Sequence, residues 1–308
     1  MKKKIKISVV CASHNGSKKI PQLIKSISRN SILPNEVIIC HTSSEDFIFL
    51  KKKFYSQFKI KKILSKKKNQ IYQRNLAIKN SKNNLILQID DDVVLKKDFF
   101  EKLYLNFKNK NDEKKNIISA LILLKPGISQ ADNWNEIYNK FYLFRLIIFI
   151  INNFKNPDNY SVLESGRCIP LIKKKDFKKS NKKIENLQWL CSTICYNKKY
   201  VSKYFNKRYQ INQKSYYEDV LFTHNLYKNH FKLKIDPNVI GFHKNYEYTN
   251  FFTYLRTIQA QLKIVNKFKK SKKLFVLDII FFSLIHFIRD IFYFLKHLIE
   301  KATSVKQF

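Results

Sequence analysis

The sequence predicts an α/β protein with a mostly parallel central sheet flanked by helices and a C-terminal amphipathic helical appendage. Strand-like apolar runs alternate with amphipathic segments through the first 125 residues. This alternation is typical of parallel strands joined by helical crossovers. The chain has 308 residues, of which 44% are hydrophobic. This is ample for a large core.

The elements are expected in a regular order. The first helix, Ser17–Arg29, has apolar residues at i, i+3, i+4 and i+7 spacing, with Ser17 as its candidate N-cap. The expected strands are Ile5–Cys11, Glu36–Cys40, Lys59–Leu64, Leu85–Ile89 and Asn116–Leu124. The further helices are Asp46–Phe58, Gln70–Lys79 and Lys97–Phe107. This spacing predicts helices on both faces of the sheet.

The regular alternation ends after residue 125. Residues Asp132–Asn153 have a long helical pattern whose apolar run is too short to span a bilayer, so a core helix and a membrane-touching insertion both stay open. We then expect a strand over Gln188–Tyr196 and a helix over Tyr217–His230. Two short strands are expected within Lys232–His243, around Asp236-Pro237-Asn238.

The C-terminal segment Leu274–Glu300 has the pattern of an amphipathic helix. On a helical wheel its charged and histidine side chains fall within an arc of about 120°: Asp278, His286, Arg289, Asp290, Lys296, His297 and Glu300. Such a helix suits a bilayer interface, and the Lys-rich segment Lys267–Lys273 would attract anionic headgroups. Packing against the protein itself or a second copy, and a true span, are the alternatives.

The composition restricts the partners and the compartment. A formal charge of +37 calls for an anionic partner, such as lipid headgroups, phosphorylated substrates or nucleic acid. Nearly all of this charge is lysine, which is poorly suited to bidentate recognition of bases, so no specific nucleic acid is expected. The five cysteines are odd in number and form no CxxC pair, which indicates reduced thiols in the cytosol. Residues Ile5–Ala12 indicate a first strand rather than an export signal.

Three consecutive carboxylates, Asp90, Asp91 and Asp92, follow the strand Leu85–Ile89. Adjacent carboxylates repel one another, so a divalent cation or hydrogen-bond donors must offset the cost. Oxygen ligands suit Mg²⁺ or Mn²⁺. The cluster falls at the carboxyl end of a strand, where open α/β sheets bind their ligands. A solvated acidic turn is the plain alternative.

Several local patterns together resemble the family-2 glycosyltransferases, which have the GT-A fold of nucleotide-diphospho-sugar transferases. The resemblance covers about residues 5–245. It is carried by Ile7-Ser8-Val9-Val10-Cys11-Ala12-Ser13-His14-Asn15, Gln73-Arg74-Asn75-Leu76-Ala77, Asp90-Asp91-Asp92, Glu218-Asp219, the segment Glu185–Lys198 and the stretch Pro237 to His243. No single pattern is specific, but their order and spacing match the family.

The resemblance implies roles for individual residues. Asp92, Asp90 and His243 are the candidate metal ligands. The candidate donor-binding residues are Ser13, His14, Asn15, His41, Arg74, Asp90 and Asp91. Asp219 is the candidate catalytic base, and Glu218 contacts or orients the acceptor. Where the family usually has an acidic residue after its second strand, this chain has His41, so the choice of nucleotide stays open.

The expected function is an inverting, metal-dependent glycosyltransferase acting in cell-surface polysaccharide synthesis. The donor is a nucleotide-diphospho-sugar, and the acceptor a glycan or a polyprenyl-linked precursor. Residues 1–245 are expected to form the transferase domain, with a nucleotide-sugar half over 1–125 and an acceptor half over 126–245. Residues 246–308 form a helical region, and the protein is expected at the inner face of the cell membrane as a peripheral cytoplasmic protein. A Lys-rich nucleic-acid-binding protein and a non-catalytic membrane-associated protein are the alternatives.

Overall fold

A computed structural model describes residues 2–42, 57–108, 114–173, 182–191, 193–205, 217–243 and 251–304. The expected helix over Asp46–Phe58 lies almost wholly outside these residues and stays a prediction. The first four strands are β1 (Lys4–Ala12), β2 (Leu33–His41), β3 (Lys59–Leu64) and β4 (Leu85–Asp90), and all four run parallel. The four predicted strands are therefore confirmed, each within a few residues of its predicted ends.

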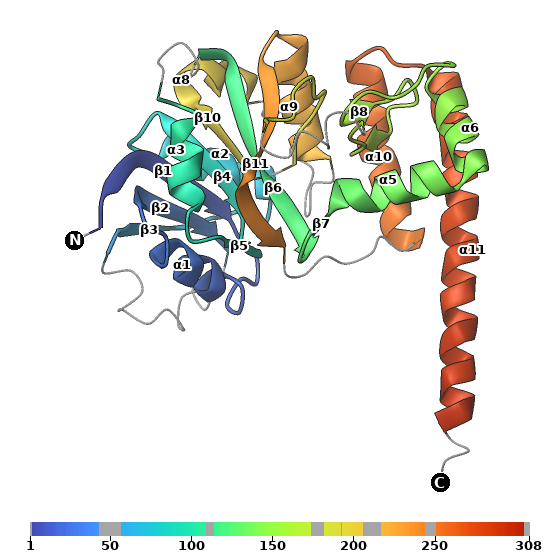
Figure 1. Ribbon diagram of the computed structural model, residues 1–308, viewed down its shortest axis with the longest axis horizontal. Coiled ribbons are helices and arrows are strands. Elements are labelled where there is room, and N and C mark those ends of the chain that lie inside the picture. Colours follow the sequence, from blue (N-terminus) through green and yellow to red (C-terminus); the bar gives the residue numbers. More distant parts are fainter. Residues whose placement is uncertain are drawn as a thin grey trace.

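The second half of the sheet is mixed. Its strands are β5 (Val93–Leu95), β6 (Asn116–Lys125), β7 (Ile128–Ser129), β10 (Ile194–Asn197) and β11 (Lys232–His243). Together with β1 to β4, these strands form one nine-stranded sheet in the order β3-β2-β1-β4-β10-β6-β11-β5, with β7 paired to β6 (Figure 1). β10 is antiparallel to both β4 and β6, and β5 is antiparallel to β11. The two short strands predicted around Pro237 are one strand, whose register against β6 shifts between Asp236 and Ile240.

Helices cover both faces of the sheet, as predicted. They are α1 (Ile20–Ser28), α2 (Gln70–Lys79), α3 (Phe99–Leu105), α8 (Lys198–Val201) and α9 (Glu218–Lys228). The short 3-10 helix η3 (Ser202–Tyr204) directly follows α8. Alternate residues of β1 divide between two cores: Val9 packs with α1 and α3, whereas Val10 packs with α2 and α9. This division follows from the two-residue period of a strand.

The first helix begins later than predicted. Ser17 is not its N-cap, because the chain first makes a turn in which the amides of Lys19 and Ile20 both donate to the carbonyl of Gly16. The helix then starts at Ile20 with a proline in its first turn and without a side-chain cap. Proline is tolerated there because the first amides of a helix have no intrahelical acceptor.

A helical unit packs beside the sheet, at the right of Figure 1. It comprises α5 (Gln130–Lys140), α6 (Tyr142–Ile151), α10 (Phe251–Lys267), α11 (Lys272–Ser304) and the hairpin of β8 (Ser161–Val162) with β9 (Cys168–Ile169). A separate hydrophobic cluster, which includes Ile148, Leu163, Ile169 and Phe282, holds this unit together. The single helix predicted over Asp132–Asn153 is wrong, because Phe141 is extended and divides it in two.

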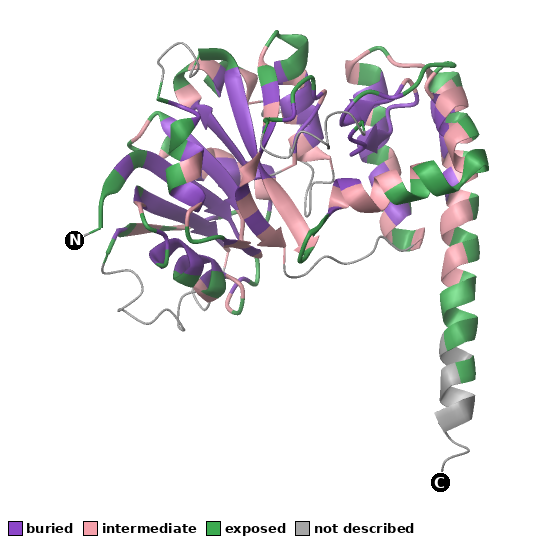
Figure 2. Cartoon of the chain, viewed as in Figure 1, coloured by how far each residue is buried: buried purple, intermediate pink, exposed green. Residues whose placement is uncertain are grey.

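The long C-terminal helix is confirmed, but Asp278, His286 and Asp290 of its predicted polar face contact the protein, whereas Lys296 is exposed. Asp278, which the wheel placed on a polar surface, is fully buried. The lower part of the helix extends past the rest of the chain, and its residues 291–296 are exposed (Figures 1 and 2). In the described part of the chain, no helix combines the length and the apolar character that a membrane crossing needs.

Candidate active site

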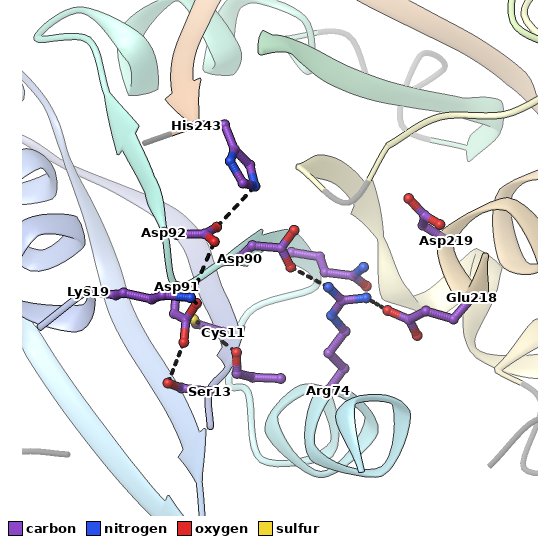
Figure 3. A network of polar contacts seen from close by, with 12 residues as sticks. Cys11, Ser13, Lys19, Arg74, Asp90, Asp91, Asp92, Glu218, Asp219 and His243 are labelled. Carbon is purple, nitrogen blue, oxygen red and sulfur yellow. Dashed lines mark hydrogen bonds and ion pairs between the residues drawn. The ribbon is translucent and has the colours of Figure 1, made fainter. Parts of the chain in front are cut away.

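The three aspartates at the end of β4 point to three different partners (Figure 3). Asp90 pairs with Arg74 of α2. Asp91 accepts a hydrogen bond from Ser13 Oγ at 2.6 Å. Asp92 Oδ1 lies 3.3 Å from His243 Nε2. Each of the three carboxylates therefore has a different polar neighbour.

Sheet register brings these residues together. Ala12 of β1 pairs with Asp90 of β4, so Ser13 and Asp91 both lie just beyond the carboxyl ends of neighbouring parallel strands. His243 ends β11 and pairs with Val93 of β5, the residue after Asp92. Residues separated by about 150 positions in the sequence thus meet at one edge of the sheet, where α/β proteins bind ligands.

The loop after β1 is closely packed. Asn15 has a left-handed backbone (φ 55°), and a Cβ on Gly16 would lie 2.0 Å from Ser13 Oγ. The loop is tied down by Gln73, a buried residue whose Nε2 donates to the carbonyls of Ser13 and Cys40 at 2.8 and 3.0 Å. Only glycine therefore leaves room for Ser13 to reach Asp91.

The two predicted histidines near this loop differ in exposure. His14 is exposed, and its Nδ1 lies 2.8 Å from Thr42 Oγ1. His41 is buried at the end of β2, and its carbonyl accepts a hydrogen bond from the amide of Ser65. His14 thus lies at the surface, and His41 lies in the interior.

Arg74 joins the two carboxylate groups of the site. Its side chain is only 4% exposed and forms ion pairs with Asp90 on one side and Glu218 on the other. Glu218 and Asp219 open α9, where the positive end of the helix dipole favours carboxylates. Arg74 of the Arg-Asn helix pattern therefore contacts Glu218 of the acidic pair directly, although 144 positions of the sequence separate them.

Asp219 faces the aspartates across a cleft. Asp219, Asp90 and His243 all line this cleft, whose volume is about 750 Å³ including its open mouth. Burial raises the pKa of Asp219 to about 6, Arg74 and the amide of Val220 oppose that rise, and Asp90 adds to it. A carboxyl with a pKa in this range can accept a proton near neutral pH.

The opposite wall of the cleft comes from the predicted acceptor-side segment. Cys191 and Thr193 line it together with Tyr160, whose ring packs on Trp189 at 5.0 Å between centroids. Ser192 lies outside the described residues. The five cysteines are free thiols, and Cys191 alone among them is not fully buried.

Asp92 and His243 could hold a divalent metal ion if a substrate diphosphate supplied further ligands. Among the described residues, no group of three or more His, Cys, Asp and Glu side chains is arranged to hold a metal ion. Asp92 and His243 do form an adjacent oxygen and nitrogen pair. Mg²⁺ is commonly held by one or two carboxylates together with substrate phosphates, so such a pair is sufficient when a diphosphate completes the site. Asp90 forms an ion pair with Arg74 and lines the same cleft as His243.

Sequence reasoning missed two residues of the site. Lys19 Nζ lies 3.5 Å from Asp92 and 3.8 Å from Asp91, and Gln73 fixes the loop after β1. Lys19 is one of many lysines in the chain, so nothing in the pattern distinguished it. Burial raises the pKa of Asp91, whereas Ser13 and Lys19 lower it.

Residues 8–158 match the family model described as glycosyl transferase family 2. The match covers just under half of the chain and shows that this part is similar to that family. A Bacillus subtilis (strain 168) protein, the uncharacterized glycosyltransferase YwdF, is 32% identical over 97 residues. The matched stretch makes up 31% of this chain and only 34% of that relative, so the chain spans about a third of its length.

Solved structures confirm the GT-A type of fold for this chain. S. aureus TarS 1-349 in complex with UDP-GlcNAc is 14% identical, with a TM-score of 0.51 over 85% of this chain and 66% of that chain. GalNAc-T7 with UDP, GalNAc and Mn²⁺ is 11% identical, with a TM-score of 0.57 over 78% of this chain and 43% of that chain. At these identities the likeness concerns the fold alone.

Proposed function

We propose that the protein is an inverting, metal-dependent glycosyltransferase that uses a nucleotide-diphospho-sugar donor. The observation that carries this proposal is the placement of Asp219 across one cleft from Asp90 and His243. A single carboxylate base on one side and a group that binds diphosphate on the other are what a direct displacement at a sugar carbon requires. The family match and the fold support the same reaction class.

The donor binds at the carboxyl ends of β1 and β4. The loop over Ser13, His14 and Asn15, with His41 in the adjoining wall, contacts the nucleoside, and Asp91 is held by Ser13 for that role. Arg74 and Lys19 supply positive charge beside the diphosphate. Asp92 and His243, with Asp90 as a further candidate, would hold Mg²⁺ or Mn²⁺. When bound, this ion neutralises the leaving diphosphate as a Lewis acid.

Asp219 activates the acceptor. Its carboxylate takes the proton of the acceptor hydroxyl while that oxygen forms a bond to the anomeric carbon, and the bond from this carbon to the diphosphate oxygen breaks. The electron pair of the broken bond leaves with the diphosphate. Because attack and departure occur on opposite faces, the sugar configuration inverts. Glu218, held by Arg74, orients the acceptor.

The acceptor is a glycan or a polyprenyl-linked precursor of a cell-surface polysaccharide. The charge of +37 supports a location at an anionic membrane, at the inner face of the cell membrane. Residues 1–245 form the transferase domain, in which 1–125 bind the donor and 126–245 the acceptor, and residues 246–308 associate with the membrane. The cleft supports this division, because its walls come from both halves.

A thermal-shift panel of UDP, GDP, CDP and dTDP, each with and without Mn²⁺, tests the proposal. A ligand that binds only the folded state raises the melting temperature. We expect a metal-dependent shift with one nucleotide, with UDP as the first candidate because the solved neighbours bind it. Asp92→Asn should abolish that shift, whereas Asp219→Asn should keep it and lose transfer.

Three results would contradict the proposal. Equal loss of donor binding in both variants would contradict the division of roles. If no nucleotide shifts the well-folded wild type, the non-catalytic membrane-associated protein becomes the better account. Salt-dependent binding to DNA without any dependence on metal would instead favour a nucleic-acid-binding protein.

A further inference from the structure

The helix α11 is apolar on much of its outer face, and the face that it buries holds a charged side chain, Asp278, between two phenylalanines. Phe275, Asp278 and Phe282 are its buried positions, at i, i+3 and i+7. A helix at the surface of a globular protein also turns an apolar stripe to the core, but its opposite face is charged or polar. The outer face of α11 is therefore not adapted to water.

Three polar residues of α11, Asp278, His286 and Asp290, contact the rest of the protein. Arg167 Nε donates to Asp278 Oδ1 and Oδ2 at 3.0 and 2.9 Å, and Ser165 Oγ donates to Oδ2 at 2.8 Å. The ring of His286 stacks on Tyr254, with 4.6 Å between centroids. Further along, Asp290 accepts the amide of Phe251 at 2.7 Å. These contacts fix the rotation of the helix about its own axis.

That rotation leaves a continuous apolar stripe on the outside. It consists of Val276, Leu277, Ile280, Leu284, Phe287, Ile288, Ile291 and Leu295, which are between 43% and 63% exposed. Its members follow one another at one-, three- and four-residue intervals, and none is charged. At 1.5 Å per residue the stripe is about 30 Å long. An apolar surface of this extent on a soluble protein marks an interaction site.

The segment 291–295 of α11 indicates what kind of partner covers the helix. The consecutive residues Ile291, Phe292, Tyr293, Phe294 and Leu295 are all at least 44% exposed, so apolar side chains point outward in every direction around the helix. A partner protein helix would cover one side of such a segment. The acyl chains of a lipid layer can surround it.

The positive charge of the protein also favours a lipid layer as the partner, in this case an anionic one. Lys272 and Lys273 are exposed where α11 begins, and the protein as a whole has a formal charge of +37. Lysines beside an apolar helix face strengthen binding to anionic headgroups. The described helix is not apolar enough to cross the bilayer, so it would lie in one leaflet.

We propose that the apolar stripe of α11 embeds in one leaflet of an anionic membrane while its polar face stays bound to the protein. The buried Arg167 immediately precedes β9, and Tyr160, which lines the cleft, immediately precedes its partner β8. The Arg167–Asp278 ion pair thereby holds the cleft at a fixed position relative to the bilayer. This last step rests on the proposed function, because it matters only if the acceptor is lipid-linked.

Vesicle sedimentation tests the proposal with a triple variant of exposed stripe residues. The substitutions are Leu284→Ser, Ile288→Ser and Ile291→Ser. We expect the wild type to sediment with vesicles of 70% phosphatidylcholine and 30% phosphatidylglycerol, and to keep most of this binding at 0.5 M NaCl, because apolar contacts are not screened. The triple variant should bind at least tenfold more weakly.

A matched control replaces three equally apolar exposed residues outside α11. The substitutions are Leu64→Ser, Leu105→Ser and Ile128→Ser, at positions that are 63%, 52% and 39% exposed. This control should bind vesicles within twofold of the wild type. The proposal is overturned if the triple variant binds like the wild type, if the wild type does not bind, or if light scattering shows a dimer that the triple variant dissociates. The nucleotide panel on the same variants reports the donor site separately, so failure of one proposal is distinguished from failure of the other.

Discussion

Replacing Asp219 by asparagine should stabilise the folded protein at neutral pH. Burial raises the pKa of this carboxyl from its ordinary 3.8 to about 6, although Arg74 lowers it. At neutral pH the ionised carboxylate of Asp219 therefore lowers the free energy of unfolding. Asparagine has no charge to bury, so it avoids this cost. A destabilising charge at a functional residue is expected where activity and stability make opposite demands on a residue.

The magnitude follows from the pKa shift. One pKa unit corresponds to about 1.4 kcal/mol, so a shift of about two units sets an upper limit of about 3 kcal/mol. The side chain of Asp219 is partly exposed, so we expect about 1–2 kcal/mol at pH 7.5. The folded state binds the proton more tightly than the unfolded state between pH 6 and 4, so the wild type gains stability as the pH falls through this window. At pH 4.5 about a third of the difference should remain.

Urea unfolding at pH 7.5 and pH 4.5 measures this difference. The control is Asp158→Asn, which removes an exposed carboxylate whose ion pair with Lys173 lies at the surface. It should change the free energy of unfolding by less than about 0.5 kcal/mol at either pH, as for most surface substitutions. If Asp219→Asn destabilises the protein at pH 7.5, or its effect does not shrink with falling pH, the carboxylate is not held at a cost and the reasoning fails.

Three further substitutions test other parts of the structure. Lys19→Gln should raise the affinity for Mn²⁺ without nucleotide about two- to fivefold in an electron paramagnetic resonance titration, because a competing surface cation is worth about 0.5–1 kcal/mol; unchanged affinity would show that the lysine does not compete. Arg167→Met should lower the free energy of unfolding in urea by about 3–5 kcal/mol, because it leaves Asp278 buried without its partner. Adding Asp278→Leu should recover most of that loss, and a single variant as stable as the wild type would refute the argument. Gly16→Ala should at least halve the nucleotide-induced thermal shift by displacing the loop, and an undiminished shift would place the nucleotide elsewhere.

Much of the sheet was predictable because each early strand and helix is defined by its own local pattern. The predicted bounds of β3 and α2 agree with the structure residue by residue. The later elements depend on distant partners. The predicted strand Gln188–Tyr196 is mostly irregular, because the amide of Leu190 donates to the side chain of Thr223 in α9 instead of to a neighbouring strand. Phe141 interrupts an otherwise continuous helical pattern, and no proline or glycine marks the break.

The site could be predicted as a set of residues but not as a set of contacts. The sequence identifies Arg74, Asp90 and Glu218 separately, whereas the ion pairs that join them depend on how α2 and α9 pack. The helical wheel correctly places the charges of α11 on one side. It cannot tell whether that side faces water or a buried arginine, because Arg167 lies 111 residues away in the sequence.

The stereochemistry of donor turnover tests the central claim that Asp219 is the single base opposite the diphosphate. The protein would be incubated with Mn²⁺ and α-linked UDP-N-acetylglucosamine, UDP-N-acetylgalactosamine, UDP-glucose or UDP-galactose, with water as the acceptor. Proton NMR would record the first sugar released, before its anomers interconvert. The account predicts the β-anomer from the wild type and no release by Asp219→Asn. Release of the α-anomer, or unchanged release by the variant, would contradict it.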